Sequence, residues 1–122
     1  INTWQLSPDQ VAGIAGPLAE AVERAGRPAG AVAVTCDLVM ARGADSKGAE
    51  ALAHRIRDMA RGWGRKDSVT DWGVGGVLHG DGDAMIEQLG RFAEVGCTEV
   101  TVSCSGIEDV RWLDENVARR LP

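Results

Sequence analysis

The sequence predicts an α/β fold, and three observations support that prediction. Apolar residues recur at helical spacing in four segments of this 122-residue chain. Two short segments rich in valine, near 31–36 and 99–104, lie between the helices and predict strands. The first of these, AVAVTC, is apolar almost without alternation, which is typical of a parallel strand covered on both faces. Strands that alternate with helices are joined by right-handed parallel crossovers.

The first helix and the one that follows the first strand have clear start signals. Residues 1–4 (INTW) are expected to be the tail of a strand. Ser7 then caps a helix and Pro8 occupies its first position, where no backbone donor is needed. Residues 26–28 (GRP) end that helix, and Asp45 with Ser46 caps the next one.

Residues 62–76 interrupt this rhythm. The segment GWGRKDSVTDWGVGG contains five glycines and two tryptophans without a clear period, so it predicts an irregular loop. Trp63 and Trp72 suggest that this loop folds back on the body of the protein or closes over something.

The last third of the chain reads as a strand-like entry followed by helix, strand and helix. Asp81 or Asp83 caps the first of these helices, and Gly96 suits its left-handed C-terminal cap. The closing helix carries one apolar stripe, formed by Val110, Leu113, Val117 and Leu121. Two strands are too few for a stable sheet, so residues 1–122 are expected to form a single partial domain. The start at Ile1 also suggests a trimmed chain.

Composition narrows the classes of partner and compartment. The net charge of −5 disfavours nucleic-acid binding, because an acidic surface repels phosphate. Three cysteines without CxxC spacing predict reduced thiols in a cytoplasmic protein. No apolar run approaches the roughly 20 residues of a membrane span. His54 and His79 are not spaced as ligands, so no metal site is predicted.

Several of these segments match motifs of one family. Residues 1–4 precede Ser7-Pro8-Asp9; Ala25-Gly26-Arg27-Pro28 leads into the first predicted strand; residues 94–100 (EVGCTEV) lead into the second; and the chain ends in Leu-Pro. Together they resemble the C-terminal part of the luciferase-like monooxygenase superfamily. Ile1 departs from the family's pattern, and residues 80–84 match its usual Gly-Thr-Pro-Glu-Glu segment only loosely.

That resemblance implies a fold and a reaction. The family consists of flavin- or deazaflavin-dependent oxidoreductases built on an eight-stranded β/α (TIM-type) barrel. The chain would supply the end of the sixth strand, the seventh and eighth strands and their helices, a C-terminal βαβα portion. The implied cofactor is FMN or the deazaflavin coenzyme F-420, acting on a small-molecule substrate. The implied partner is the missing N-terminal barrel portion, without which the chain is expected to be inactive.

Barrel active sites lie at the C-terminal ends of strands, and three places in the chain meet that test. Asn2, Thr3 and Trp4 are candidate cofactor contacts, although Trp4 equally suits simple packing. Asp37 is a candidate substrate contact or an ordinary turn residue. After the last strand, small residues can cradle an anion on hydroxyls and backbone amides, although Ser105 also suits ordinary helix capping. This last set consists of Ser103, Ser105 and Gly106. No residue is assigned a catalytic role.

Two other readings remain open. The chain can be a stand-alone interaction module that forms a homodimer through its open strand edges, since a second copy would complete a four-stranded core. It can also belong to a different α/β enzyme that contains a similar two-strand unit.

Overall fold

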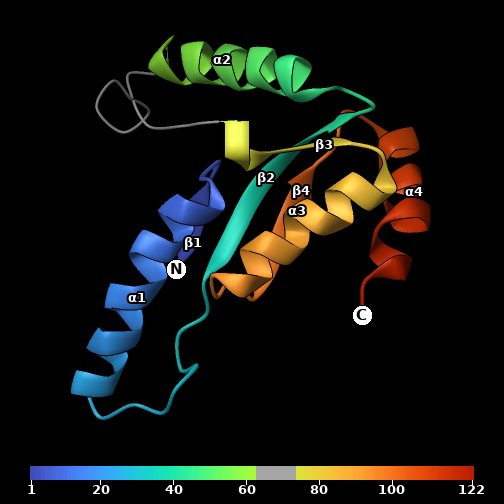
Figure 1. Ribbon diagram of the computed structural model, residues 1–122. Coiled ribbons are helices and arrows are strands. Elements are labelled where there is room, and N and C mark those ends of the chain that lie inside the picture. Colours follow the sequence, from blue (N-terminus) through green and yellow to red (C-terminus); the bar gives the residue numbers. More distant parts are fainter. Residues whose placement is uncertain (63–73) are drawn as a thin grey trace.

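The computed structural model describes residues 1–62 and 74–122, which fold around a four-stranded parallel sheet with helices on both faces (Figure 1). This arrangement confirms the predicted α/β class. In chain order the elements are β1 (Asn2–Trp4), α1 (Pro8–Arg24), β2 (Thr35–Arg42), α2 (Ser46–Gly62), the 3-10 turn η1 (Val74–Gly76), β3 (Val77–Gly80), α3 (Gly82–Glu94), β4 (Glu99–Ser103), α4 (Ile107–Asn116) and the 3-10 turn η2 (Ala118–Arg120).

Strand β2 is the centre of the sheet, because β1, β3 and β4 all pair with it. The backbone of Thr35 donates to Ile1, the carbonyl of Asp37 accepts from Gln5, and Gly43 donates to Gly80. The N–H and C=O of one strand residue point to the same side. The odd-numbered residues of β2 therefore form backbone hydrogen bonds with β1, and then with β3, along one edge of the strand. The even-numbered residues bond to β4 along the other edge.

The exchange from β1 to β3 along that edge depends on close backbone contact. The pairing with β1 ends at Asp37, and the pairing with β3 begins at Val39. Gln5 turns the chain away with φ of 57°, a region that residues with a Cβ seldom adopt. Gly76 takes the vacated place, and a Cβ added there would lie 2.5 Å from the backbone carbonyl carbon of Gln5. Only glycine fits this position without displacing the neighbouring chain.

The two faces of the sheet carry different layers. Helices α1, α3 and α4 cover the face formed by the even-numbered residues of β2, where a single core contains Val11, Leu38, Phe92 and Val117. Helix α2 lies on the opposite face and packs against Trp4, Val39, Ala41 and Val77. Figure 1 shows α2 at one end of the sheet, well separated from α3 and α4.

The predicted helix boundaries are largely confirmed. The Ser7 hydroxyl accepts from the Gln10 backbone N–H, and the Gln10 side chain accepts from the Ser7 backbone N–H. Helix α1 therefore begins with a complete capping box. Asp81 caps α3 through the Ala84 amide. Gly96 has φ of 93°, as the left-handed cap after α3 requires. The apolar stripe predicted for the closing helix is divided, because α4 ends at Asn116 and Val117 begins the turn into η2.

The strand predicted near 31–36 is wrong in its boundaries. The segment 31–34 precedes the strand, which begins at Thr35 and continues to Arg42. Partner strands decide these limits: β1 first bonds to β2 at Thr35, and β3 continues the ladder to Arg42. Asp37 consequently lies inside the strand and not at its C-terminal end.

Two further expectations are revised. The strand-like entry at residues 77–80 is a true strand, so the sheet has four strands where two complete ones were expected. The loop predicted for 62–76 has helical ends, since Gly62 closes α2 and residues 74–76 form η1. The rest of that loop, with Trp63 and Trp72, lies outside the described residues.

The glycine at the strand exchange provides a matched stability test. Gly76→Ala is expected to lower the free energy of unfolding by about 1–3 kcal/mol, because the new methyl group overpacks against Gln5. Gly13→Ala, on an exposed and unobstructed position of α1, is expected to raise it by roughly 0.5–1 kcal/mol through higher helix propensity. Denaturant unfolding measures both values. Equal effects of the two substitutions would contradict the close approach at Gly76.

Candidate functional site

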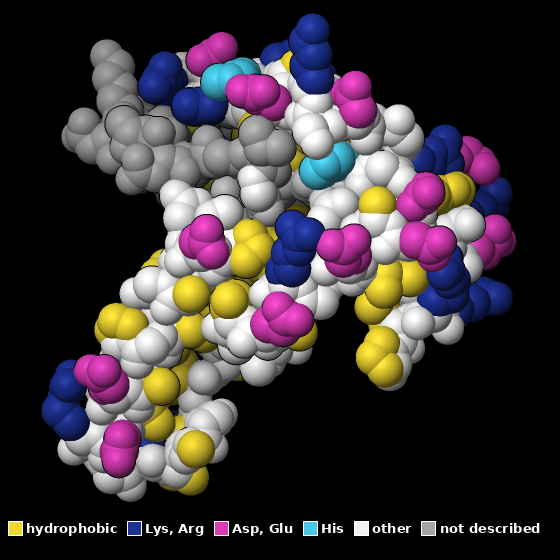
Figure 2. All heavy atoms as spheres, viewed as in Figure 1, with side chains coloured by type: hydrophobic (Ala, Val, Ile, Leu, Met, Phe, Trp, Pro, Cys, Tyr) yellow, Lys and Arg dark blue, Asp and Glu magenta, His cyan; other side chains and the backbone are white. Residues whose placement is uncertain are grey.

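The four strands are parallel, so their carboxyl ends point the same way, but the ends are staggered along β2: β1 ends opposite Asp37, β4 opposite Val39 and β3 opposite Arg42. All four ends nevertheless lie on the carboxyl side of the sheet, which is the side that forms the mouth of a β/α barrel. The candidate site consists of this side, made by Gln5, Arg42, Gly80 and Ser103 with the turns that follow them. Figure 2 shows acidic and basic side chains intermingled over α2 and α4, with hydrophobic side chains along α1 and near the C-terminal end of the chain.

Two predicted site residues meet, but deeper in the sheet than expected. Asn2 donates from Nδ2 to the Asp37 carboxylate over 2.8 Å. The Thr35 hydroxyl donates to Asn2 Oδ1 over 2.9 Å, so both ends of the amide are engaged. Asp37 is the third residue of β2, five positions before Arg42. The pair therefore forms a polar cluster in the amino-terminal half of β2, although it lies beside the end of β1, where the Asp37 carbonyl accepts from the Gln5 backbone.

Thr3 and Trp4 point to opposite faces. Thr3 is 5% exposed and lies on the α1 and α3 side, with its hydroxyl 3.0 Å from the Thr35 carbonyl and 3.1 Å from the Cys36 sulfur. Trp4 lies on the other face and packs with Ile56 and Ala60 of α2. Of these two, only Trp4 shares a face with the Asn2–Asp37 pair.

The turn after β4 is more acidic than an anion cradle requires. Gly106 is the N-cap of α4 in an extended conformation, and no side chain caps this helix, so the capping expected of Ser105 is wrong. Glu108 and Asp109 occupy the first helical turn, where their charges already complement the helix dipole and oppose a second anion. Ser103 and Ser105 are exposed beside this turn.

Arg42, which no sequence motif marks, reaches this turn from the end of β2. Its Nε lies 3.5 Å from Asp109, and its guanidinium lies 5.7 Å from the centre of the Trp112 ring. Burial, followed by the charge of Asp109, raises the pKa of the Cys104 thiol. The thiol is thus held in its neutral form, which does not favour a nucleophilic role.

Gln5 carries the clearest signs of a functional position at the strand ends. It is 2% exposed, has a positive φ, and its Nε2 has no hydrogen-bond partner within the described part of the chain. Backbone strain and unsatisfied buried polar groups are both costly and concentrate at binding sites. No sequence pattern marks this residue, because both features arise from the exchange of β1 for β3.

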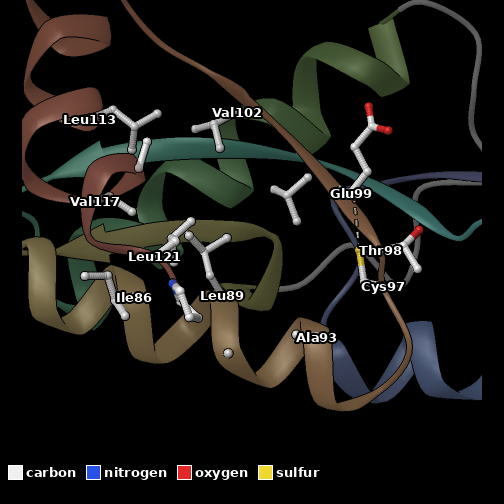
Figure 3. Close-up of a pocket in the computed structure, with 14 residues that line it drawn as sticks. Ile86, Leu89, Ala93, Cys97, Thr98, Glu99, Val102, Leu113, Val117 and Leu121 are labelled. Carbon is white, nitrogen blue, oxygen red and sulfur yellow. Dashed lines mark hydrogen bonds between the residues drawn. The ribbon is translucent and has the colours of Figure 1, made fainter.

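An apolar groove lies on the face of the sheet that α1, α3 and α4 cover, between α3, β4 and the C-terminal segment. Its volume is about 760 Å³. Figure 3 shows side chains from the three elements converging on it, with Cys97, Thr98 and Glu99 at one end. The lining is mostly aliphatic and includes Leu89, Val102, Leu113, Val117 and Leu121.

Residues 1–62 and 74–122 contain neither a membrane-spanning helix nor a cluster of metal ligands. None of the helices there combines the length and the apolar character needed to cross a bilayer. No group of three or more His, Cys, Asp or Glu side chains in these ranges is placed to hold a metal ion.

Comparison with known proteins identifies the fold. No protein-family model and no curated protein matches the chain. A solved structure of an F420-dependent secondary alcohol dehydrogenase, in complex with an F420-acetone adduct, is similar to 96% of this chain with a TM-score of 0.66. The fold is part of a β/α barrel. Sequence identity is 15%, and the chain spans 41% of the length of that protein.

The unpartnered amide of Gln5 predicts an unusual mutational response. Gln5→Leu is expected to raise the free energy of unfolding by about 1 kcal/mol, because a buried amide without a partner is costly. Gln10→Leu is the matched control and is expected to lower it by about 1 kcal/mol, because it breaks the capping box of α1. Chemical denaturation compares the two variants. A larger loss for Gln5→Leu would reveal a stabilising partner for its amide.

Proposed function

We propose that the chain is the C-terminal portion of a luciferase-like, deazaflavin-dependent oxidoreductase that transfers hydride to or from a small secondary alcohol or ketone. The similarity of nearly the whole chain to part of an F420-dependent secondary alcohol dehydrogenase carries this proposal. A deazaflavin, when bound, supplies the hydride-transfer chemistry, and the protein positions the substrate. FMN with monooxygenase activity is the related alternative.

The residues at the strand ends fit one part of such a cofactor better than another. Ser103 and Ser105 offer exposed hydroxyls, and the Cβ direction of Gly106 is open space. These groups suit hydrogen bonds to hydroxyl groups on an uncharged part of the cofactor. The carboxylates of Glu108 and Asp109 and the pairing of Arg42 with Asp109 argue against a phosphate at the same turn. We therefore assign Ser103, Ser105 and Gly106 to an uncharged region of the cofactor.

The other predicted contacts receive different roles. Asn2 holds Asp37 by a direct hydrogen bond, so both residues shape the polar face of the sheet that would line the barrel interior. Trp4 packs between this face of the sheet and α2. Thr3 stabilises the opposite layer, away from the ligand.

The open edge of β4 supports the partner assigned to this chain. The even-numbered residues of β2 form backbone hydrogen bonds with the odd-numbered residues of β4. The N–H and C=O groups of Val100 and Val102 therefore face away from β2. Their side chains also line the apolar groove. A further strand on this edge, with an apolar helix in the groove, would continue the barrel. We propose that the missing N-terminal barrel portion supplies both.

The proposed function predicts that the 122-residue chain by itself does not turn over. With F420 and 2-propanol it is expected to give no reduction of the cofactor, whereas the longest polypeptide that its gene encodes is expected to reduce it. Cofactor absorbance follows the reaction. Turnover by the 122-residue chain would contradict the need for the rest of the barrel. Activity of the long polypeptide with FMN and not F420 would favour the flavin alternative, and activity with neither would overturn the proposed function.

Two variants of the long polypeptide test whether Ser103 contacts the cofactor. Ser103→Ala is expected to weaken cofactor binding about fivefold, the equivalent of one hydrogen bond. Glu20→Ala, at an exposed position of α1 and outside the candidate site, is expected to leave the dissociation constant unchanged.

The second candidate function, an interaction module, rests on the same open edge. In that case a second copy pairs through β4, and sedimentation at increasing concentration detects a dimer. Val102→Pro is expected to abolish the dimer, because it removes an outward-facing donor without touching the ladder to β2. Val102→Ala is the control that shortens the side chain and keeps the donor. A folded monomer at every concentration would eliminate this function.

A further inference from the structure

Two cysteines far apart in the sequence lie in direct contact in the core. Cys36 is the second residue of β2, and Cys97 lies in the turn between α3 and β4. Their sulfurs are 3.2 Å apart across 61 positions of sequence. A disulfide holds its sulfurs about 2.05 Å apart, so an approach of roughly 1 Å would bring these two to bonding distance.

The surroundings of the two thiols differ. Cys97 is 8% exposed and lines the apolar groove, where Figure 3 shows it beside Thr98 and Glu99. Cys36 is 1% exposed and lies behind it, within 3.1 Å of the Thr3 hydroxyl. A small molecule in the groove can therefore reach Cys97 before it reaches Cys36.

We propose that Cys36 and Cys97 form a reversible disulfide, with Cys97 as the attacking thiol and Cys36 as the resolving thiol toward small, neutral disulfides. The Cys97 thiolate attacks the reagent, forms a mixed disulfide and releases one thiol. Cys36 then attacks the Cys97 sulfur of that mixed disulfide and releases the second thiol. The two cysteines lose two electrons and two protons in total, and the reagent gains them as two thiols.

The bond would join two segments that otherwise depend on hydrogen bonds. Cys36 belongs to the central strand, and Cys97 precedes β4, which pairs only with β2 among the described strands. A covalent link would fix the entry of β4 against β2. It would also remove the Cys97 S–H that lies 3.2 Å from the Glu99 carbonyl at the end of the groove. The proposal is independent of the proposed oxidoreductase function.

Burial sets the rate of this reaction. Burial, followed by the hydrogen bond with Cys36, raises the pKa of the Cys97 thiol to about 11. The thiolate is the reactive form, so its fraction and the initial rate increase about tenfold for each pH unit between 7 and 10. A pH-independent rate in that window would show that chain opening, and not thiolate formation at Cys97, limits the reaction.

The experiment treats the folded 122-residue chain with bis(2-hydroxyethyl) disulfide and measures its mass without reduction. The expected product has lost two hydrogens, and proteolysis yields one peptide pair that contains Cys36 and Cys97. The midpoint of thermal unfolding is expected to rise by about 10 °C, because the cross-link restricts a long loop of the unfolded chain. Dithiothreitol is expected to reverse both changes.

Cys104 provides the matched control, because it is half-buried and its sulfur contacts the Val102 carbonyl and no cysteine sulfur among the described contacts. Cys104→Ser is expected to form the same cross-link at the same rate. Cys36→Ser is expected to stop at the mixed disulfide on Cys97. Products that carry only separate mixed disulfides, or a cross-link that contains Cys104, would overturn the proposal.

Discussion

The pairing of β2 on both edges is the constraint on which the rest of the structure depends. Within the described residues, each of the other three strands pairs with this one and with no further strand. Its even-numbered side chains, Cys36, Leu38 and Met40, form the centre of the main core. Its odd-numbered side chains form the opposite face, which is polar near Asp37 and apolar beneath α2. One strand thereby fixes the positions of both helical layers.

The division of one edge between β1 and β3 concentrates conformational cost at the strand ends. Gln5 adopts a positive φ and buries an amide without a partner among the described residues, and Gly76 passes directly against its backbone. Such costs persist only where the surrounding structure enforces them. They occur at the carboxyl ends of parallel strands, the part of a β/α barrel where ligands bind. Strain and location therefore favour the same candidate site.

Among the described strands, β4 pairs only with β2 and forms one edge of the sheet. The outer edge of β4 offers backbone hydrogen-bonding groups, and the groove next to it is lined mostly by apolar side chains, with Thr98 and Glu99 at one end. Exposed Ile107 and Val110 extend this apolar character along α4. Large apolar patches on a protein surface mark sites of association. This surface is the basis of the proposal that a further strand and helix pack here.

Much of the local structure could be read from the sequence because its determinants are local. The capping box of Ser7 and Gln10, the cap at Asp81 and the left-handed turn at Gly96 depend on residues within a few positions of one another. The barrel class followed from motif resemblance and from strands alternating with helices. Asn2 and Asp37 were both named as site residues, but nothing local indicated that they bond to each other.

Tertiary structure decided whatever depends on distant segments. The limits of β2 came from its partners, which moved Asp37 from the end of the strand to its interior. The same long-range pairing created the strained Gln5, brought Arg42 to Asp109 and placed Cys36 against Cys97. Short-range sequence patterns encode propensity and amphipathicity, whereas strand register and sulfur contacts require the chain to have folded. The sequence alone determined the class of fold and its helices, and the three-dimensional pairing around β2 determined which side chains meet.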